Sequence, residues 1–395
     1  MNKCKIFMRV LCLFLVAVML TVSFSGCAQI KSNKIMKGLS EEDMDCPAYD
    51  LEKYTNYYWD SDVIYNESVM PLEEEDGSIK PIPLMYKATK ILAVRNSHLD
   101  VLYEEGKDYV LKDGMLVIPE GSSINTIEYT TYYPAEGERI TEKTGGGYIL
   151  GGGLHELQIA VTYIHTDKWQ GTVPKAQGGS LPKTVEKLKN KEPIKILIYG
   201  DSICEGAEAT STVGEDGTAP YMPTWFSMFE KKLKEVYDYD EIEIINTAVG
   251  GSDSQWGYQN STERGRNYEP DLAIIGYGMN DIARDPVEFC DNISYIMMDI
   301  TSGNPDCEYI LISTMLANPE SAHFFGTQQY FNEAMQKYNW NFTATAVVAD
   351  MTTLYSDILA QKRYWDINSN NINHPNDFLI RAYAQLMLRT LEVEE

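Results

Sequence analysis

The spacing of hydrophobic and polar positions along the chain changes near residue 194. Before that point, short hydrophobic runs alternate with turn residues, a pattern typical of antiparallel strands. Asp113-Gly114 separates two such runs and predicts a hairpin, because this dipeptide favours a tight two-residue turn. Apolar residues at every second position from Leu157 to Tyr163 predict a strand with one buried face. We therefore predict an all-β unit over residues 56–167, a β-sandwich of jelly-roll type. The other predicted strands cover residues 91–94, 101–103, 109–111, 115–118 and 124–133.

From residue 194 onward, short apolar runs alternate with longer stretches of helical periodicity. This alternation predicts an α/β domain over residues 194–395, built on a parallel sheet with helices on both faces. Residues 168–193 are rich in Lys, Pro and Gly and are predicted to form a linker with a short helix around 185–188. The predicted strands are 194–199, 242–246, 272–277, 309–314 and 344–348, and the predicted helices lie near 223–238, 286–302, 326–340, 351–362 and 377–392.

The first 27 residues have the pattern of a secretory signal peptide. Three basic residues precede an apolar run over residues 10–24, and Ser25-Gly26-Cys27 follows. Small residues before a cysteine resemble the lipobox of bacterial lipoproteins, which implies that Cys27 is lipidated. The alternative is an ordinary signal peptide with Cys27 as a free thiol. Residues 28–55 are polar and acidic, as expected of a tether, so we expect an exported protein held at the outer face of the cell membrane.

The charge balance restricts the classes of partner. The chain has 58 acidic and 33 basic residues, and loss of residues 1–27 would change the net charge from −25 to −28, because that segment has three basic and no acidic residues. Such a surface repels nucleic acids and favours neutral substrates such as sugars. The four cysteines after Cys27 have no Cys-x-x-Cys spacing, and no cluster of metal-ligand residues is evident, so neither a metal nor another cofactor is expected.

Four short blocks in the second half of the chain carry the candidate chemistry. They are Gly200-Asp201-Ser202 and residues 246–251, 278–281 and 373–375. The first three follow predicted strands, and the fourth precedes the last predicted helix. Because ligand sites in such folds lie outside the carboxyl ends of the strands, we expect the four blocks to meet there.

Each block offers one group that acyl transfer to a serine requires. Ser202 supplies a hydroxyl, Gly251 a backbone N–H, Asn280 an amide N–H and His374 a base. Taken singly, these residues are also explained by a turn, a helix cap or a surface histidine. Their joint occurrence in this order favours an esterase centre.

These motifs closely resemble those of the SGNH hydrolases, also called the GDSL esterase and lipase family, over residues 194–390. The resemblance implies a flavodoxin-like, three-layer α/β/α fold. It further implies that Ser202 is the nucleophile and His374 the general base. The backbone N–H groups of Ser202 and Gly251, with the Asn280 side chain, would form the oxyanion hole.

One position departs from the family pattern. The family usually has an aspartate three residues before the histidine, where this chain has Asn371. An amide orients an imidazole but stabilises its charged form poorly. Three alternatives are open: Asn371 orients His374, a nearby acid such as Asp366 replaces the missing one, or a backbone carbonyl completes a Ser-His dyad.

Export, an accessory β unit and an acidic surface together suggest removal of O-acetyl groups from polysaccharide outside the cell. Some carbohydrate esterases of this superfamily are similar in working as dyads and in having a β-sandwich before the hydrolase domain. Tyr221, Trp225 and Trp256 are candidates for stacking on sugars. The alternatives are a lipase or phospholipase acting on longer acyl esters, and a non-catalytic glycan-binding lipoprotein.

Overall fold

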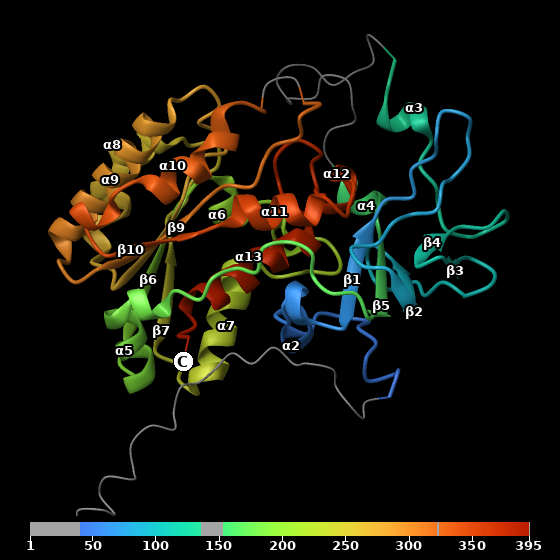
Figure 1. The fold of residues 1–395 in the computed structure, drawn as a ribbon, viewed down its shortest axis with the longest axis horizontal. Helices are drawn as coiled ribbons and strands as arrows, with labels where there is room; N and C mark the ends of the chain where they lie inside the picture. The colour runs from blue at the N-terminus through green and yellow to red at the C-terminus, as the bar shows by residue number, and fades with distance from the viewer. Residues whose placement is uncertain (1–39, 136–152, 322–323, 395) are drawn as a thin grey trace, which may run out of the picture.

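The computed structural model describes residues 40–135, 153–321 and 324–394 (Figure 1). The predicted signal peptide, Cys27 and the first part of the predicted tether lie outside the described residues. Among the described helices, none combines the length and the apolar character needed to cross a bilayer.

A five-stranded parallel sheet organises the C-terminal half, as the sequence predicted. Its strands are β6 (Ile194–Gly200), β7 (Ile242–Asn246), β8 (Leu272–Gly276), β9 (Glu308–Ile312) and β10 (Ala346–Ala349). They are arranged in the order β10-β9-β8-β6-β7, which is the flavodoxin-like order with β6 as the first strand. The chain changes direction across the sheet between β6 and β8, and in such folds this switch point is where ligands bind.

Helices cover both faces of the parallel sheet. On one face lie α8 (Ser254–Arg264), α9 (Pro286–Gly303) and α10 (Phe331–Lys337), and on the other lie α7 (Trp225–Tyr237) and α13 (Asp377–Leu391), as Figure 1 shows. The second face also packs against α5 (Pro182–Asn190) and α11 (Met351–Leu359).

Alternation along the strands explains the two cores. In β6, Ile196 and Ile198 pack into one core, while Leu197 and Tyr199 pack into the other. All four side chains are fully buried, because a strand between two helical layers exposes neither face. The α/β class predicted from the sequence is therefore confirmed.

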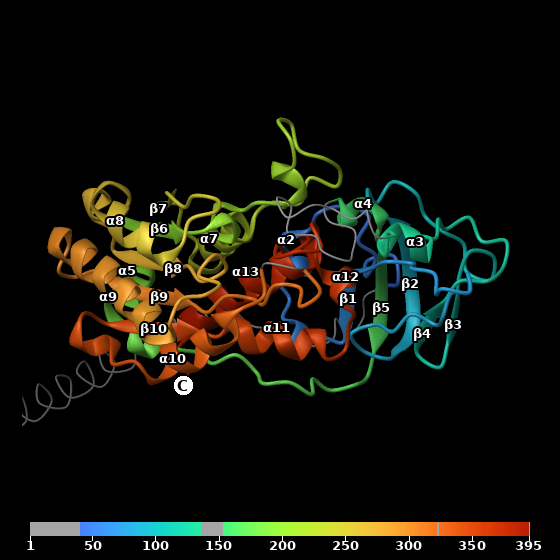
Figure 2. The same cartoon turned by 90° about the horizontal axis from the view of Figure 1, so that it is seen from above.

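The N-terminal half contains a three-stranded antiparallel sheet and a two-stranded ribbon, visible in the right half of Figure 2. The sheet has the order β1-β5-β2 and consists of β1 (Val63–Val69), β2 (Ala88–Asn96) and β5 (Ile159–His165). The ribbon joins β3 (Val110–Lys112) to β4 (Met115–Val117). Its turn is the predicted Asp113-Gly114, with both residues at positive φ, 55° and 81°.

The predicted β-sandwich is only weakly indicated by these strands. Strand β1 is buried along nearly its whole length, but helices α13 and α12 (Tyr364–Ile367) of the C-terminal half pack against it. Helices thus cover the face that a second sheet would cover in a sandwich. The predicted strand 124–133 is instead a single bridge at Ile127 followed by helix α3 (Tyr129–Tyr132).

The remaining short helices connect these parts. The predicted linker helix is α5, which is longer than expected and packs against the parallel sheet through Leu188. The others are α2 (Leu51–Tyr54), α4 (Leu154–Leu157) and α6 (Ser202–Glu205). One continuous hydrophobic core contains residues of both halves, from Cys46 to Leu391.

A buried ion pair joins the two halves. The Lys362 ammonium group donates to the Glu67 carboxylate, and both side chains are 0% exposed. Glu67 also accepts from the Met85 N–H at 2.9 Å and from the Tyr163 hydroxyl at 2.6 Å. The remaining lone pairs of this buried carboxylate are thus satisfied, as a desolvated ion pair requires.

Replacing Lys362 by Met should leave the Glu67 charge buried without its cation. We expect the free energy of unfolding to fall by about 3–5 kcal/mol, the usual cost of breaking a buried pair. Urea unfolding of the purified protein, followed by tryptophan fluorescence, measures this loss. Adding Glu67→Gln to the same chain should restore part of it, and an unchanged midpoint in Lys362→Met would contradict the ion pair.

Candidate active site

Ser202 lies at the carboxyl end of β6, as the first residue of α6. The strand ends at Gly200, where an added Cβ would lie 2.2 Å from the Gly276 carbonyl oxygen, so only glycine fits between the strand ends. Asp201 caps α6 by accepting from the Ile203 N–H at 3.0 Å. The buried indole of Trp225 donates to the Ile203 carbonyl at 3.0 Å. Trp225 therefore supports the nucleophile helix and is not a sugar-stacking surface.

His374 lies on a loop that ends where α13 begins. The loop is closed by a bridge between Asn368 and Pro375 and by the Ser369 N–H, which donates to the His374 carbonyl at 3.2 Å. Asn376 then caps α13, accepting from two N–H groups of its first turn at 3.1 Å. This loop brings the imidazole Nε2 to 2.6 Å from the Ser202 Oγ, although the two residues are 172 positions apart in sequence.

Three candidate N–H donors lie at the start of α6 and on the loops that follow β7 and β8. Among the described residues, nothing accepts from the backbone N–H groups of Ser202 and Gly251. A Cβ at Gly250 would lie 3.7 Å from the Ser202 Cβ, so this loop packs against the nucleophile. Asn280 donates one amide hydrogen to the Ser252 carbonyl at 2.9 Å, which fixes its amide and leaves the other hydrogen available.

Two buried carboxylates tie the loops together. Asp201 accepts from the Met279 N–H at 3.3 Å in addition to capping α6, and burial raises its pKa to about 7. Asp281 accepts from the N–H and the hydroxyl of Ser254, at 3.0 and 2.6 Å, and pairs with Arg284. Burial raises the pKa of Asp281, although these partners favour its charged form. The loops after β6, β7 and β8 are therefore held in one arrangement.

Burial also sets the ionisation of the histidine. Desolvation lowers the pKa of His374 from its ordinary value of 6.5, while the negative charge of Glu208 opposes this shift. Because the net effect is a lowered pKa, His374 is neutral at neutral pH. A neutral imidazole is the form that can accept a proton.

The partner of the second ring nitrogen is a residue that sequence reasoning missed. The Asn370 Nδ2 lies 2.5 Å from the His374 Nδ1. The Asn370 Oδ1 accepts from the backbone N–H groups of Ile372, Asn373 and His374, each at 3.0 Å. A run of asparagines before a histidine is the available sequence signal, since asparagine side chains readily bond the backbone a few residues on.

The two residues expected to orient the histidine are engaged elsewhere. Asp366 accepts from Arg363 at 2.8 Å and from the Met70 N–H at 2.7 Å. Asn371 has left-handed backbone, with φ 58°, and its Oδ1 accepts from the Tyr132 hydroxyl at 2.8 Å. Among the described residues, the Nδ1 partner is the Asn370 amide, and not Asp366, Asn371 or a backbone carbonyl.

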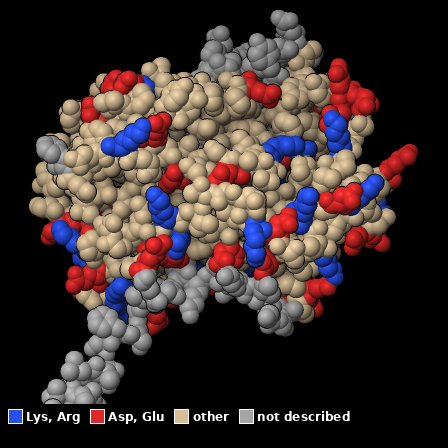
Figure 3. All heavy atoms as spheres, in the orientation of Figure 1, with Lys and Arg blue, Asp and Glu red and all other residues tan. Residues whose placement is uncertain are grey.

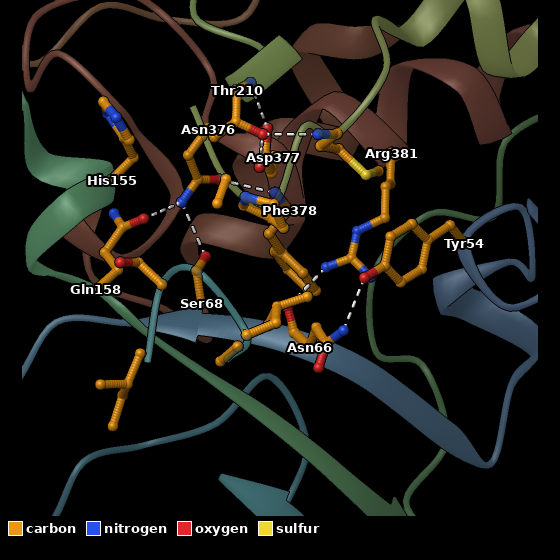
Figure 4. Close-up of a pocket in the computed structure, with 17 residues that line it drawn as sticks. Tyr54, Asn66, Ser68, His155, Gln158, Thr210, Asn376, Asp377, Phe378 and Arg381 are labelled. Atoms are coloured by element: carbon orange, nitrogen blue, oxygen red, sulfur yellow. Dashed lines mark hydrogen bonds between the residues drawn. The ribbon is translucent and has the colours of Figure 1, made fainter. Parts of the chain in front are cut away.

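The N-terminal half supports the histidine loop directly. Gln158 donates to the carbonyls of Trp365 and Asn368, at 2.7 and 2.9 Å. It also accepts from the Asn376 amide at 2.8 Å, as Figure 4 shows. The Leu154 N–H donates to the Ser369 carbonyl at 2.7 Å. The loop is thus held on both sides, by α13 and by the two ends of α4.

A pocket lies beside this contact, between the two halves, with an empty volume of about 510 Å³ (Figure 4). His155 lines it with two buried ring nitrogens that have no hydrogen-bond partner among the described residues, and burial lowers its pKa. Asp377 accepts from the Thr210 N–H and hydroxyl, and burial raises its pKa to about 6. Arg381 donates to backbone carbonyls of β1. Ser202, Gly251, Asn280 and His374 are not among the residues that line this pocket.

The two remaining candidates for stacking on sugars, Tyr221 and Trp256, differ in exposure. Tyr221 is 60% exposed beside the loop that follows α6, so it remains available for stacking. Trp256 is partly buried, with the Arg264 guanidinium 5.4 Å from its ring centroid. Within the described ranges, no group of three or more His, Cys, Asp or Glu residues is arranged to hold a metal ion.

Comparison with known families agrees with this geometry. Residues 198–378 match the model of the GDSL-like Lipase/Acylhydrolase family. The α/β part of the chain is therefore a GDSL-like lipase/acylhydrolase domain of SGNH type, which confirms the resemblance predicted from the sequence. A search of curated proteins found no match.

A search of solved structures found matches of low sequence identity. A two-domain esterase active on acetylated mannans has 18% identity and a TM-score of 0.43, and the match covers 56% of this chain. The chain spans 55% of the length of that esterase. A catalytic mutant of the acetylxylan esterase Axe2 from Geobacillus stearothermophilus has 17% identity and a TM-score of 0.41, over 51% of this chain and 95% of that one.

Replacing Gln158 by Ala should disturb the histidine loop from the N-terminal side. Two carbonyls lose their donor and Asn376 loses an acceptor, so we expect a stability loss of about 1–3 kcal/mol. Displacement of the imidazole should lower kcat, by up to about 10²-fold for a shift of 1 Å, with little change in KM. Steady-state kinetics on a nitrophenyl ester measure the effect.

Thr89→Ala is the matched control for Gln158→Ala. The exposed Thr89 hydroxyl donates to the Ile164 carbonyl at 3.0 Å, within the β1-β5-β2 sheet, and the substitution removes this hydrogen bond. Its kcat should equal that of the unmodified protein. Equal kcat values for both variants would show that Gln158 does not position the loop.

Proposed function

We propose that this protein is a serine esterase that works through an acyl-enzyme. The observation that carries the proposal is the 2.6 Å contact between the Ser202 Oγ and the His374 Nε2, within a GDSL-like hydrolase domain. A serine hydroxyl becomes an effective nucleophile when a base lies at this distance. The unsatisfied N–H groups nearby provide the second requirement, stabilisation of a developing oxyanion.

The reaction follows from the roles of these groups. His374 accepts the Ser202 proton as the Oγ attacks the ester carbonyl. The N–H groups of Ser202 and Gly251 and the free amide hydrogen of Asn280 donate to the resulting oxyanion. The imidazolium then protonates the leaving alcohol, and a water molecule, activated by the same histidine, hydrolyses the acyl-serine.

The proposed substrate class is an acetylated or other short-acyl carbohydrate. Support comes from the net charge of −25, which disfavours polyanions. Figure 3 shows acidic and basic side chains interspersed on the face drawn, with no single basic patch. We further propose export and a lipid anchor at Cys27, on the sequence pattern alone.

Ester hydrolysis should depend entirely on Ser202. Acetate release from acetylated xylan and acetylated manno-oligosaccharides, beside nitrophenyl esters from acetyl to long acyl, measures activity and acyl preference. We expect activity confined to short acyl groups and lost in Ser202→Ala. A preference for long acyl chains would indicate a lipase, and the absence of Ser202-dependent hydrolysis of any ester would contradict the enzymatic function.

Replacing Asn280 by Ala should remove one oxyanion donor. We expect kcat to fall by about 10²–10³-fold with a smaller effect on KM, because the donor acts mainly on the transition state. Asn260→Ala is the control. It removes a side-chain amide from α8 whose Nδ2 also donates to a backbone carbonyl, that of Trp256, at 2.8 Å. Comparable losses in both variants would argue against a role for Asn280 at the oxyanion.

The pH dependence of kcat/KM should report the lowered pKa of His374. Only the neutral imidazole can accept the Ser202 proton, so the rate falls as pH falls through this pKa. Because burial lowers the pKa from 6.5, the acidic limb should lie below 6.5. A limb above 6.5 on nitrophenyl acetate would mean that a negative charge dominates the environment of the imidazole.

A further inference from the structure

We propose that Asn370 is a positioning residue that holds His374 in the tautomer with its proton on Nε2, so that the Ser202–His374 pair is kept in a slow form that a single carboxylate would accelerate. This inference rests on the proposed esterase function. It identifies the residue that takes the place of the expected triad acid, one position before Asn371.

The hydrogen bonds of the Asn370 amide fix its orientation. Its Oδ1 accepts from three backbone N–H groups at 3.0 Å each. A flipped amide would turn its NH₂ group toward these three donors, and all three hydrogen bonds would be lost. The NH₂ group therefore faces the His374 Nδ1, at 2.5 Å, and also donates to the Asn373 Oδ1 at 3.1 Å.

This orientation dictates the histidine tautomer. Since an amide N–H can only donate, the Nδ1 must accept, and the single proton of the neutral ring is on Nε2. The Nε2–H then donates to the Ser202 Oγ across the 2.6 Å contact. In this tautomer Nε2 has no lone pair for the serine proton. The competent tautomer requires an Nδ1–H, which would meet the Asn370 N–H donor.

The imidazolium that forms during the reaction has a proton on both nitrogens. Its Nδ1–H would therefore also face the Asn370 N–H donor. The nearby carboxylates stabilise this imidazolium only in part. Glu208 is the charged group that raises the pKa of His374, and its carboxylate accepts from the Ser369 hydroxyl at 3.2 Å. Asp366 is paired with Arg363, and Asp377 is bound to Thr210. Glu208 thus supplies attraction without a hydrogen bond to the ring.

Replacing Asn370 by Asp changes one group of the side chain. The Oδ1 can still accept from the three backbone N–H groups, while the second oxygen replaces the NH₂ and accepts from an Nδ1–H. The Nε2 is then free to accept the Ser202 proton. We expect kcat/KM to rise at least tenfold, up to the ~10⁴ that separates the aspartate and asparagine forms of a serine-protease triad. The acidic limb of the pH profile should move to higher pH, because the carboxylate stabilises the imidazolium.

Asn371→Asp is the matched control. It places a carboxylate at the position expected from the family pattern, where the side chain accepts from Tyr132, and it should give no gain. Both variants are compared with the unmodified full-length protein for melting temperature and for hydrolysis of nitrophenyl acetate. A folded Asn370→Asp variant with unchanged or lower kcat/KM and an unmoved limb overturns the proposal, as does an equal gain in Asn371→Asp.

The tautomer is also measurable without any activity. Nitrogen-15 chemical shifts of His374 distinguish a protonated from an unprotonated ring nitrogen. The unmodified protein should show the proton on Nε2 at neutral pH, and Asn370→Asp should show it on Nδ1. A proton on Nδ1 in the unmodified protein overturns the proposal even if ester hydrolysis is confirmed. The expected tautomer in a protein without Ser202-dependent hydrolysis would sustain the role of Asn370 while refuting the esterase function.

Discussion

The position of the histidine loop is the constraint on which the candidate site depends. Ser202 is fixed by the end of a buried strand, but His374 arrives from a loop 172 residues later in the chain. A loop has no ladder of its own to hold it, so its backbone polar groups need other partners. Asn370 satisfies three N–H groups from inside the loop, and Gln158 satisfies two carbonyls beside it.

This arrangement gives the N-terminal half a structural role in the site. Its sheet is small, with three strands, and one of its strands is covered by helices of the hydrolase half. The buried Glu67–Lys362 pair and the shared core fix the two halves together. The largest hydrophobic core is shared by the two halves, and residues from both support the loop that carries His374.

The sequence was informative where periodicity or turn chemistry is strong. All five strands of the parallel sheet and the Asp113-Gly114 hairpin were predicted, because buried strands are continuous apolar runs and the turn requires positive φ. Strand β1 was missed because Asn66 and Glu67 interrupt its apolar pattern, and both are buried only through partners distant in sequence. Helix α8 was missed because it is largely polar, with few apolar residues to mark its buried face.

The sequence predicts the members of the candidate site, but not the residues that support them. The order of the four blocks places Ser202, Gly251, Asn280 and His374 at one edge of the sheet. The partner of the His374 Nδ1 was not predictable, because the path of a short loop decides which of several adjacent asparagines faces the ring. Left-handed backbone at Asn371 turns that side chain toward Tyr132.

Chemical labelling of the nucleophile tests the Ser202–His374 pair directly. The protein is treated with a fluorophosphonate, which reacts with activated serines, and the modified peptide is identified by mass spectrometry. If His374 activates Ser202, one adduct should form, on Ser202. It should be absent from Ser202→Ala and should form much more slowly in His374→Ala. An adduct on another residue, or equal labelling with and without His374, would contradict a Ser202–His374 esterase centre.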